Sequence, residues 1–542
     1  MNKKTLLALL GIMILAAFFR FYDLGNVPHG LYPDEAMNGN NALEALSPAG
    51  HFKLYYPENN GREGLFMNLQ AISVAAFGNE PWALRLVSGI FGTLTVLGVF
   101  FLARVLFKDD EIALLAALFI ATSFWHINFS RIGFRAIMAP FFLTWGLYFL
   151  WRALFRESQT GNFRYPWKKW ALLAAGGLFF GGGLHSYIAY RVAPLLLAFP
   201  FFKHLKMTLA VGKQVLMPSL EYKKFAATWG IFLGAALLAA LPLLTYYALN
   251  PADFFGRTAQ ISIFSLENPV RELLVNTAKT IGMFFWAGDY NWRHNLSGAP
   301  ELWWPVAIAF ALGLIVALAR RTVKYWLLLS WLAVMLLPVV VSAEGIPHAL
   351  RAILVIPPVM ILAALGAKVL IDGVRDWFMK NIALYPEYAD QLSRIKKEMR
   401  LLFAAFVIAL IANTFIAYFW RWGASIETFN AFAGRYAEIG YYLRALPNDL
   451  PKYVIVNASG TDVRGLPMPT QTIMYLTDTF MPDKQAAKNL HYIFPRDAST
   501  FTCPNNCFVV ALEHDAALYG RLKEKAPGLI LDTSPGFAAL KK

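Results

Sequence analysis

Long apolar runs separated by basic segments constrain this chain more than any other feature of its sequence. A helix needs about 20 mostly apolar residues to cross a bilayer, because it rises about 1.5 Å per residue through a hydrocarbon core of about 30 Å. Segments near that length lie at 4–22, 82–103, 112–129, 134–154, 170–187, 188–202, 227–249, 302–319, 323–342, 347–371 and 401–420. We therefore expect a polytopic α-helical membrane protein with about 11 spans.

The composition agrees with this interpretation and excludes a string of soluble domains. Hydrophobic residues make up 57% of the 542 residues and charged residues only 15%, against about a quarter in soluble proteins. Lys and Arg number 49 against 34 Asp and Glu, which gives a net charge of +15. In a soluble protein this charge could indicate nucleic acid. Here the basic residues fall between apolar runs, so we expect no nucleic-acid partner.

The basic segments also predict the topology. With the amino terminus inside, the basic segments fall on the cytoplasmic side, at 104–108, 152–169, 203–224, 320–324 and 368–400. No small-residue cleavage site follows the first apolar run, so we expect it to be a retained span rather than a signal peptide. Counting residues 65–77 as a span would put the later basic clusters outside, so we expect an interfacial helix there. The protein should be multi-pass in the cell inner (plasma) membrane.

The pattern changes after Gly423, and an odd number of crossings places this last region outside. Residues 427–446 have a helical pattern, while 453–456, 491–494 and 508–512 resemble strands between turn residues. We therefore expect a small extracytoplasmic α/β domain at 426–542. The membrane domain would be 1–425, with its first outer loop at 23–81.

The two cysteines of the chain lie in this outer region. Cys503 and Cys507 would close a turn as a disulfide in an oxidising compartment, which we favour. The alternative is a zinc site made by both cysteines with His491 and His514, although their spacing matches no strong zinc signature.

Acidic residues gather in the first outer loop. Asp34 and Glu35 follow Pro33 and open a segment with a helical pattern through residue 46. Acids are common in the first turn of a helix, so this motif could be only the start of a capped interfacial helix. Glu58 and Glu63 lie further along the loop, just before its apolar stretch. A carboxylate beside lipid costs free energy unless it is paired or functional.

Basic residues recur at the expected outer ends of several spans, against the orientation rule. They are Arg131, Arg135, Arg191, His348 and Arg351. Any one of these side chains could extend to the interface at little cost. Their shared position at the expected outer face suggests phosphate binding instead. The guanidinium group of arginine presents a planar fork of donors that suits phosphate oxygens. An anionic head group in the outer leaflet would explain them together.

Acids and phosphate-binding arginines beside lipid favour one chemistry, glycosyl transfer from a polyprenyl phosphate sugar. A hydroxyl acceptor is a weak nucleophile, so one carboxylate must take its proton during the attack. The departing phosphate needs charge stabilisation more than protonation. A transporter or flippase for an anionic lipid-linked sugar is the alternative, although paired broken helices are not evident. A non-catalytic scaffold is a third possibility, and it gives no reason for these charges.

Four stretches resemble a known family: Pro33-Asp-Glu35, Phe77-Gly-Asn-Glu-Pro-Trp-Ala-Leu-Arg85-Leu-Val-Ser-Gly89, Ser130-Arg-Ile-Gly-Phe-Arg-Ala136 and Tyr187-Ile-Ala-Tyr-Arg191. Over roughly residues 1–370 the chain resembles the lipid-dependent glycosyltransferases of the C-type membrane fold. The branch concerned contains protein O-mannosyltransferases and the aminoarabinose transferase of lipid A. The chain lacks the Glu-Lys-Pro expected of the aminoarabinose branch, which argues against that substrate.

The resemblance implies an inverting transferase that uses a polyprenyl phosphate-linked sugar donor and a hydroxyl acceptor on protein, lipid or glycan. Asp34 would be the catalytic base, Glu35 would orient its loop, and Glu63 matches a second acid of the first loop. The candidates for donor phosphate or sugar binding are Arg62, Arg131, Arg135, Arg191, His348 and Arg351, of which we expect at least one to be structural. Arg62 could instead form a salt bridge with Glu63. No metal cofactor is required, although the adjacent acids could bind a divalent ion.

Overall fold

The computed structural model describes residues 1–155, 166–212, 218–260, 262–499, 501–503 and 506–542. Residues 156–165 and 213–217, which belong to two of the expected cytoplasmic loops, lie outside the described residues. The chain divides into two compact units. We call residues 1–22, 88–131 and 135–422 the membrane unit, and residues 23–87, 132–134 and 423–542 the sheet unit.

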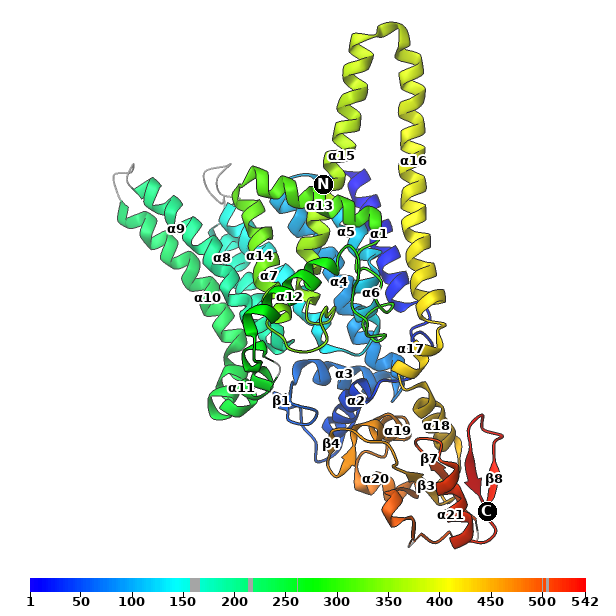
Figure 1. Ribbon diagram of the computed structural model, residues 1–542. Helices are drawn as coiled ribbons and strands as arrows, with labels where there is room; N and C mark the ends of the chain where they lie inside the picture. Colours follow the sequence, from blue (N-terminus) through cyan, green and yellow to red (C-terminus); the bar gives the residue numbers. More distant parts are fainter. Residues whose placement is uncertain (156–165, 213–217, 261, 500, 504–505) are drawn as a thin grey trace. The chain divides into compact units, whose positions relative to one another are not determined.

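The membrane unit is helical (Figure 1). Its α-helices are α1 (Lys3–Phe21), α4 (Pro81–Phe107, from Ser88 onward), α5 (Asp110–Ala121), α6 (Phe124–Arg131), α7 (Met138–Phe155), α8 (Pro166–Gly182), α9 (Ala198–Gly212), α10 (Pro218–Leu249), α11 (Pro251–Gln260), α12 (Pro269–Gly282), α13 (Trp304–Arg320), α14 (Val323–Val340), α15 (Ile356–Leu384) and α16 (Ala389–Phe415). The 3-10 helices η1 (Arg135–Ile137) and η4 (Ile188–Leu197) precede α7 and α9, and a π-helical turn, η8 (Ile416–Trp422), continues α16.

All of the apolar runs singled out in the sequence coincide with helical segments. Among the described residues, 8 helices are long and apolar enough to cross a membrane, or up to 9 if a bent pair counts as one span. The prediction of a polytopic helical protein is therefore confirmed, while the expected number of about 11 spans is supported only in part. The run at 302–319 forms α13, which has 17 residues, and α8 also has 17.

The run predicted as one span at 112–129 is broken. Helices α5 and α6 meet there at a bend of 56°. The Thr122 hydroxyl donates a hydrogen bond back to the Leu118 carbonyl at 2.8 Å, and the Ser123 hydroxyl accepts one from the His126 backbone N–H at 3.3 Å. One hydroxyl thus ends α5 and the next begins α6, since such side chains compete with the helical hydrogen bonds.

Close packing of α8 against α10 uses a glycine, as the small residues of α8 suggest. A Cβ added to Gly181 would overlap the backbone carbonyl of Ala236 on α10. Small residues at helix crossings allow backbones to approach closely in membrane proteins.

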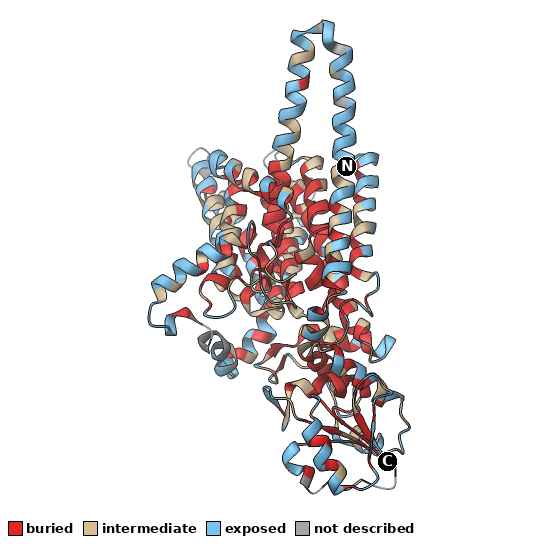
Figure 2. Cartoon of the chain, turned by 45° about the vertical axis from the view of Figure 1, so that its right-hand side comes forward, coloured by how far each residue is buried: buried red, intermediate tan, exposed pale blue. Residues whose placement is uncertain are grey.

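The basic segment 368–400, which we expected as a loop between two spans on the cytoplasmic side, is helical over most of its length, so the prediction of an irregular loop is wrong. Helix α15 continues to Leu384, and α16 begins again at Ala389, so the two form a long helical hairpin with a short turn (Figure 1). Its far end is mostly exposed (Figure 2). Ion pairs support this helical extension, because Lys368 pairs with Asp372 one turn away and Arg375 Nη1 lies 2.8 Å from Glu111 Oε2.

The sheet unit contains a five-stranded sheet with strand order β6-β3-β7-β9-β8. Its strands are β3 (Lys452–Ile455), β6 (Leu490–Ile493), β7 (Phe508–Ala511), β8 (Ile530–Asp532) and β9 (Ala539–Lys541), and a separate short pair is β4 (Asp462–Val463) and β5 (Leu466–Pro467). β3 pairs in parallel with β6 and β7, whereas β9 is antiparallel to β7 and β8. The runs expected as strands at 453–456, 491–494 and 508–512 thus form the parallel part.

Helices surround this sheet, and the strands are mostly buried (Figure 2). They are α17 (Ile426–Ala431), α18 (Gly434–Ala445), α19 (Gln471–Thr477), α20 (Pro482–Ala487) and α21 (Ala516–Lys525). A disulfide joins Cys503 to Cys507, as favoured from the sequence. The alternative zinc site at these cysteines is therefore wrong, because bonded sulfurs are not thiolate ligands.

The first outer loop belongs to this same unit. It forms α2 (Pro33–Leu46), the hairpin β1 (Tyr55–Tyr56) and β2 (Arg62–Glu63), and α3 (Leu65–Phe77). Apolar residues from the loop and from the carboxyl-terminal region share one core: Leu31, Ala36, Val74 and Leu84 with Ala437, Tyr475 and Leu476. We expected this loop to belong to the membrane domain, whereas residues 23–87 form one compact unit with residues 132–134 and 423–542.

Candidate functional site

The predicted acids lie at the start of α2, in the first helical turn. Pro33 occupies the first helical position, and the Glu35 carboxylate accepts a hydrogen bond from the Tyr32 backbone N–H at 3.3 Å. This arrangement follows from the sequence, because Pro fits the first turn and acids complement the positive end of the helix dipole. The two acids nevertheless have very different surroundings.

Glu35 is completely buried and paired with Arg85. Arg85 Nε lies 3.0 Å from Glu35 Oε1, and both side chains have 0% exposure. Oε1 also accepts a hydrogen bond from the Gly133 backbone N–H at 2.6 Å. Arg85 donates further bonds to the carbonyls of Pro28 at 2.9 Å and Gly30 at 2.7 Å. Buried charges persist only when they are paired in this way, so Glu35 fixes the loop.

Asp34 is the accessible acid of the pair. Its side chain is partly exposed, and its Oδ1 accepts a hydrogen bond from Asn59 Nδ2 at 2.9 Å. Its Oδ2 makes no hydrogen bond to any other described residue. A carboxylate with one oxygen held and the other open is suited to receive a proton from a substrate.

Asn59, which donates the hydrogen bond to Asp34, lies in a turn whose residues have positive φ angles. Asn59, Asn60 and Gly61 have successive positive φ angles of 53°, 62° and 79°. Asn and Gly are the residues that adopt this conformation at least cost. The turn joins β1 to β2.

Arg62 and Glu63 form β2 and are both only 2% exposed. Arg62 donates to Asn38 Oδ1 and Asn41 Oδ1 on α2, each at 2.5 Å, and to the Glu58 carbonyl at 3.3 Å. The guanidinium therefore fastens the hairpin to the helix that carries Asp34. Glu63 pairs in register with Tyr55 as a buried strand residue.

Glu58 joins a charged network within the sheet unit. Arg464 Nη2 lies 2.6 Å from Glu58 Oε1 and 3.0 Å from Glu44 Oε2. Burial by itself would raise the pKa of Glu58, but the hydrogen bond from Arg464, a backbone hydrogen bond and the charges of Arg464 and Arg62 outweigh it, so the pKa lies below its usual value. The first outer loop is thus tied to the residues around β4 and β5.

The five basic candidates of the expected outer ends belong to the membrane unit, and Arg131 is the most deeply placed of them. It has 0% exposure and donates to the Phe19 carbonyl at 3.0 Å. Its guanidinium also lies over the rings of Tyr418 and Phe419, at 5.3 and 5.0 Å. These are the contacts of a structural residue.

Arg135, Arg191 and Arg351 remain partly exposed. The Arg135 guanidinium lies 5.8 Å from the Tyr187 ring centre. Arg191 donates to the Phe254 carbonyl at 2.5 Å and to the Tyr247 hydroxyl at 2.9 Å. Arg351 donates to the Ser342 hydroxyl and to the Glu344 carbonyl at 2.7 Å.

His348 lies in a cluster with Asp289 and His294, two residues that we did not predict as site residues. The Nδ1 atom of His294 is 2.9 Å from Asp289 Oδ2, and that of His348 is 3.7 Å from the same oxygen. Burial is the main cause of a lowered pKa for both imidazoles. This cluster was hard to predict, because His348 lies far along the chain from Asp289 and His294.

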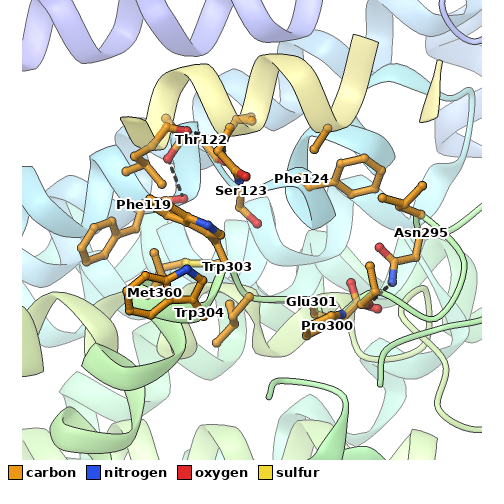
Figure 3. A pocket seen from close by; sticks show the side chains of 18 of the residues that line it. Phe119, Thr122, Ser123, Phe124, Asn295, Pro300, Glu301, Trp303, Trp304 and Met360 are labelled. Carbon is orange, nitrogen blue, oxygen red and sulfur yellow. Dashed lines mark hydrogen bonds between the residues drawn. The ribbon is translucent and has the colours of Figure 1, made fainter. Parts of the chain in front are cut away.

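A cavity of about 230 Å³ lies elsewhere in the membrane unit (Figure 3). Its lining includes Thr122, Asn295, Glu301, Trp303, Trp304 and Arg421. None of the acids or bases singled out in the sequence lines it. Burial raises the pKa of Glu301 well above its usual value, and its Oε2 has no hydrogen-bond partner among the described residues.

Comparisons with known proteins agree with the resemblance seen in the sequence. The family model for dolichyl-phosphate-mannose-protein mannosyltransferase matches residues 60–255. The crystal structure of ArnT from Cupriavidus metallidurans bound to undecaprenyl phosphate superimposes with a TM-score of 0.59 at 12% identity, over 98% of this chain and 97% of that one. The chain has the C-type glycosyltransferase fold. The predicted resemblance to this group is confirmed, and the family match supports the prediction of a glycosyltransferase.

A second C-type glycosyltransferase is larger. The oligosaccharyltransferase of Archaeoglobus fulgidus, tethered to an acceptor peptide, superimposes with a TM-score of 0.50 at 16% identity over 88% of this chain. This chain spans 63% of the length of that enzyme. A search of curated proteins by sequence found no match.

Proposed function

We propose that this protein is an inverting glycosyltransferase that moves a monosaccharide from a polyprenyl phosphate to a hydroxyl acceptor at the outer face of the membrane. The family match at residues 60–255 and the C-type fold support the reaction class. The observation that carries the proposal is the contrast between Asp34, which is accessible, and Glu35, which is locked to Arg85.

In this proposal, Asp34 is the catalytic base. Its Oδ2 accepts the proton of the acceptor hydroxyl while the hydroxyl oxygen attacks the anomeric carbon. The hydrogen bond from Asn59 to Oδ1 holds the carboxylate in one orientation. Glu35, through Arg85 and the Gly133 N–H, keeps the start of α2 in place, and it is a positioning residue.

A single displacement with inversion follows from this division of roles. Retention would need a second carboxylate to form a covalent glycosyl intermediate. Glu35 is excluded from that task, because its oxygens accept bonds from Arg85, Gly133 and Tyr32 inside the protein. Glu63 is buried in β2, and we assign it to supporting the loop.

The leaving group is a phosphate monoester, which basic residues would stabilise as its charge develops. We assign this task first to Arg135, Arg191 and Arg351, which are partly exposed residues. Arg131 and Arg62 are buried against protein groups, so we assign them to structure. His348 is taken up separately below.

The proposed reaction does not require a metal at the adjacent acids. A divalent ion prefers several oxygen ligands of negative charge, and the charge of Glu35 is already neutralised by its buried ion pair with Arg85. Asp34 alone would be a weak site. We therefore retain the prediction that catalysis at Asp34 proceeds without a metal cofactor.

The proposed setting is the cell inner (plasma) membrane, with the amino terminus inside and the sheet unit outside. The distribution of basic residues along the chain supports this topology. The partners would be the polyprenyl phosphate-linked donor, a hydroxyl acceptor on protein, lipid or glycan, and the bilayer itself.

The test is a transfer assay with purified protein in lipid nanodiscs. A synthetic polyprenyl phosphate with an isotopically labelled sugar is supplied with peptide, lipid and glycan acceptors, and the anomeric configuration of the product is read by NMR. We expect a covalent product whose anomeric configuration is inverted relative to the donor. Retained configuration would contradict the single displacement, and lipid movement between leaflets without any product would favour a transporter.

A further inference from the structure

We propose that Asp289, His294 and His348 bind a divalent transition-metal ion, for which Zn²⁺ is the best match. Asp289 and His294 belong to the segment between α12 and α13, and His348 belongs to the segment between α14 and α15. One ligand atom from each residue lies within 4.8 Å of the others. This site shares no residue with the proposed catalytic pair Asp34 and Glu35, and it would join two segments of the membrane unit.

The distances suit a small ion. Zinc binds imidazole nitrogen and carboxylate oxygen at about 2.0–2.2 Å, so neighbouring ligand atoms of a tetrahedral site lie roughly 3.3 Å apart. The separations from Asp289 Oδ2 to the two Nδ1 atoms, 2.9 and 3.7 Å, fall on either side of that value.

The chemistry of these residues also fits. Two imidazoles and one carboxylate are a common set for zinc, which then keeps a fourth position for water or another ligand. Both imidazoles are largely enclosed by the protein, with 6% of the His294 side chain and 14% of the His348 side chain exposed. The carboxylate is oriented by backbone donors, since Ala349 N–H bonds to Oδ2 at 2.9 Å and Asn291 N–H bonds to Oδ1 at 2.8 Å.

A nearby buried acid is a second observation that points to a cation. Glu301 Oε1 accepts a hydrogen bond from the Asp289 backbone N–H at 3.1 Å, while Oε2 is buried without a partner among the described residues. Two neighbouring buried acids repel each other, and a divalent ion bound to Asp289 would offset that repulsion.

Hydrogen bonding alone explains only part of the cluster. A proton on His294 Nδ1 would account for its 2.9 Å contact with Asp289. The second imidazole is held less closely, because its Nδ1 accepts only a long hydrogen bond from the Arg351 backbone N–H at 3.4 Å and lies 3.7 Å from the same oxygen, while its ring stacks on His294 with centres 4.9 Å apart. A metal accounts for both rings, and it makes His348 a metal ligand rather than a donor-binding residue.

The test measures metal content and stability of the full-length protein in detergent, without reference to transfer activity. Purified protein is treated with a chelator, reconstituted with Zn²⁺, desalted and analysed by inductively coupled plasma mass spectrometry. Wild-type protein should retain about one zinc per chain. His348→Ala and Asp289→Asn should retain less than about a fifth of that amount, whereas the control His514→Ala, at an exposed position of the sheet unit, should match wild type.

A second measurement covers the case in which a variant is poorly folded. Zn²⁺ added to the chelated wild-type protein should raise its apparent Tm, because the ion binds only the native state, and Mg²⁺ should not. Co²⁺ in place of Zn²⁺ should give the visible absorption of a tetrahedral site. Absence of retained zinc, of a Zn²⁺-dependent Tm shift and of a cobalt spectrum in wild-type protein would overturn the proposal, as would full retention of zinc by His348→Ala.

Discussion

Glu35 and Arg85 form a fully buried ion pair whose closest atoms, Oε1 and Nε, lie 3.0 Å apart. The pair links α2 to the start of α4, across 50 positions of the sequence. Asp34, the residue next to Glu35, takes no part in it. Adjacent acids therefore have separable roles, one in holding the loop and one in the proposed chemistry.

Loss of one partner of the buried pair should unfold the first outer loop. Glu35→Gln or Arg85→Ala leaves a buried charge uncompensated, which typically costs about 3–5 kcal/mol. We expect a clear fall in apparent Tm together with loss of activity. Asp34→Asn should leave the Tm close to that of wild type, because Asp34 is partly exposed.

The matched control for the buried pair is an exposed one. Arg435 and Glu438 form an ion pair with side chains 48% and 47% exposed, so Glu438→Gln should change stability very little. Thermal unfolding followed by size-exclusion chromatography would measure all of these variants. An unchanged Tm in Glu35→Gln would show that the pair does not hold the loop.

The Glu58–Arg464 pair should make the sheet unit sensitive to acid. The pKa of Glu58 is lowered in the folded protein, so its ionised form stabilises folding above the unfolded pKa, and that contribution is lost as the pH falls through the folded pKa. Glu58→Gln should therefore lower the apparent Tm at pH 7. The difference from wild type should shrink at pH values below the usual range for glutamate.

Measuring the Tm of both proteins across that pH range would check this expectation. A difference that stays constant from neutral to acidic pH would show that Glu58 does not act through its charge. Arg464 is 43% exposed, so the effect should be modest and should weaken at high salt.

Donor KM and Tm measured on variants should distinguish the donor-binding basic residues of the membrane unit from the structural ones. Arg135→Gln or Arg351→Gln should raise the KM for the polyprenyl phosphate donor, by about tenfold for a lost charged hydrogen bond, with little change in Tm. Arg131→Gln should instead lower the Tm, since its guanidinium contacts the Phe19 carbonyl and the rings of Tyr418 and Phe419. An unaltered donor KM in both of the first variants would remove these residues from the donor site.

The disulfide gives a test of topology. Cys503 and Cys507 are joined in the sheet unit, which we place outside the membrane. In spheroplasts, a maleimide that cannot cross membranes should label the protein only after reduction by a non-permeant reductant. Labelling that needs membrane disruption as well would place the sheet unit inside.

Local sequence patterns predicted most of the long helices and the three parallel strands of the sheet. Apolar length identified the helical runs, and short apolar stretches between turn residues identified β3, β6 and β7. The strands β8 and β9, with three residues each, are too short to leave a periodic signal. The α15–α16 hairpin was misjudged because its charged segment looks like a loop by composition, although its ion pairs support a helix.

The candidate site was predictable only where its residues are neighbours in sequence. Asp34 and Glu35 stand out beside Pro33, yet nothing local shows that Glu35 is buried and Asp34 is not. Arg85 and Asp289 lie far along the chain from Glu35 and His348, their partners. Tertiary folding brings such pairs together, and a single sequence does not show which distant residues become neighbours in space.

The most direct test of the central claim is the transfer rate of Asp34→Asn with a labelled polyprenyl phosphate sugar and a saturating acceptor. Its control is Asp483→Asn, an exposed acid of the same unit. If Asp34 is the base, its variant should lose about 10²–10⁴-fold in kcat while the control and the Tm remain unchanged. An Asp34→Asn protein that transfers sugar as fast as wild type would contradict the account.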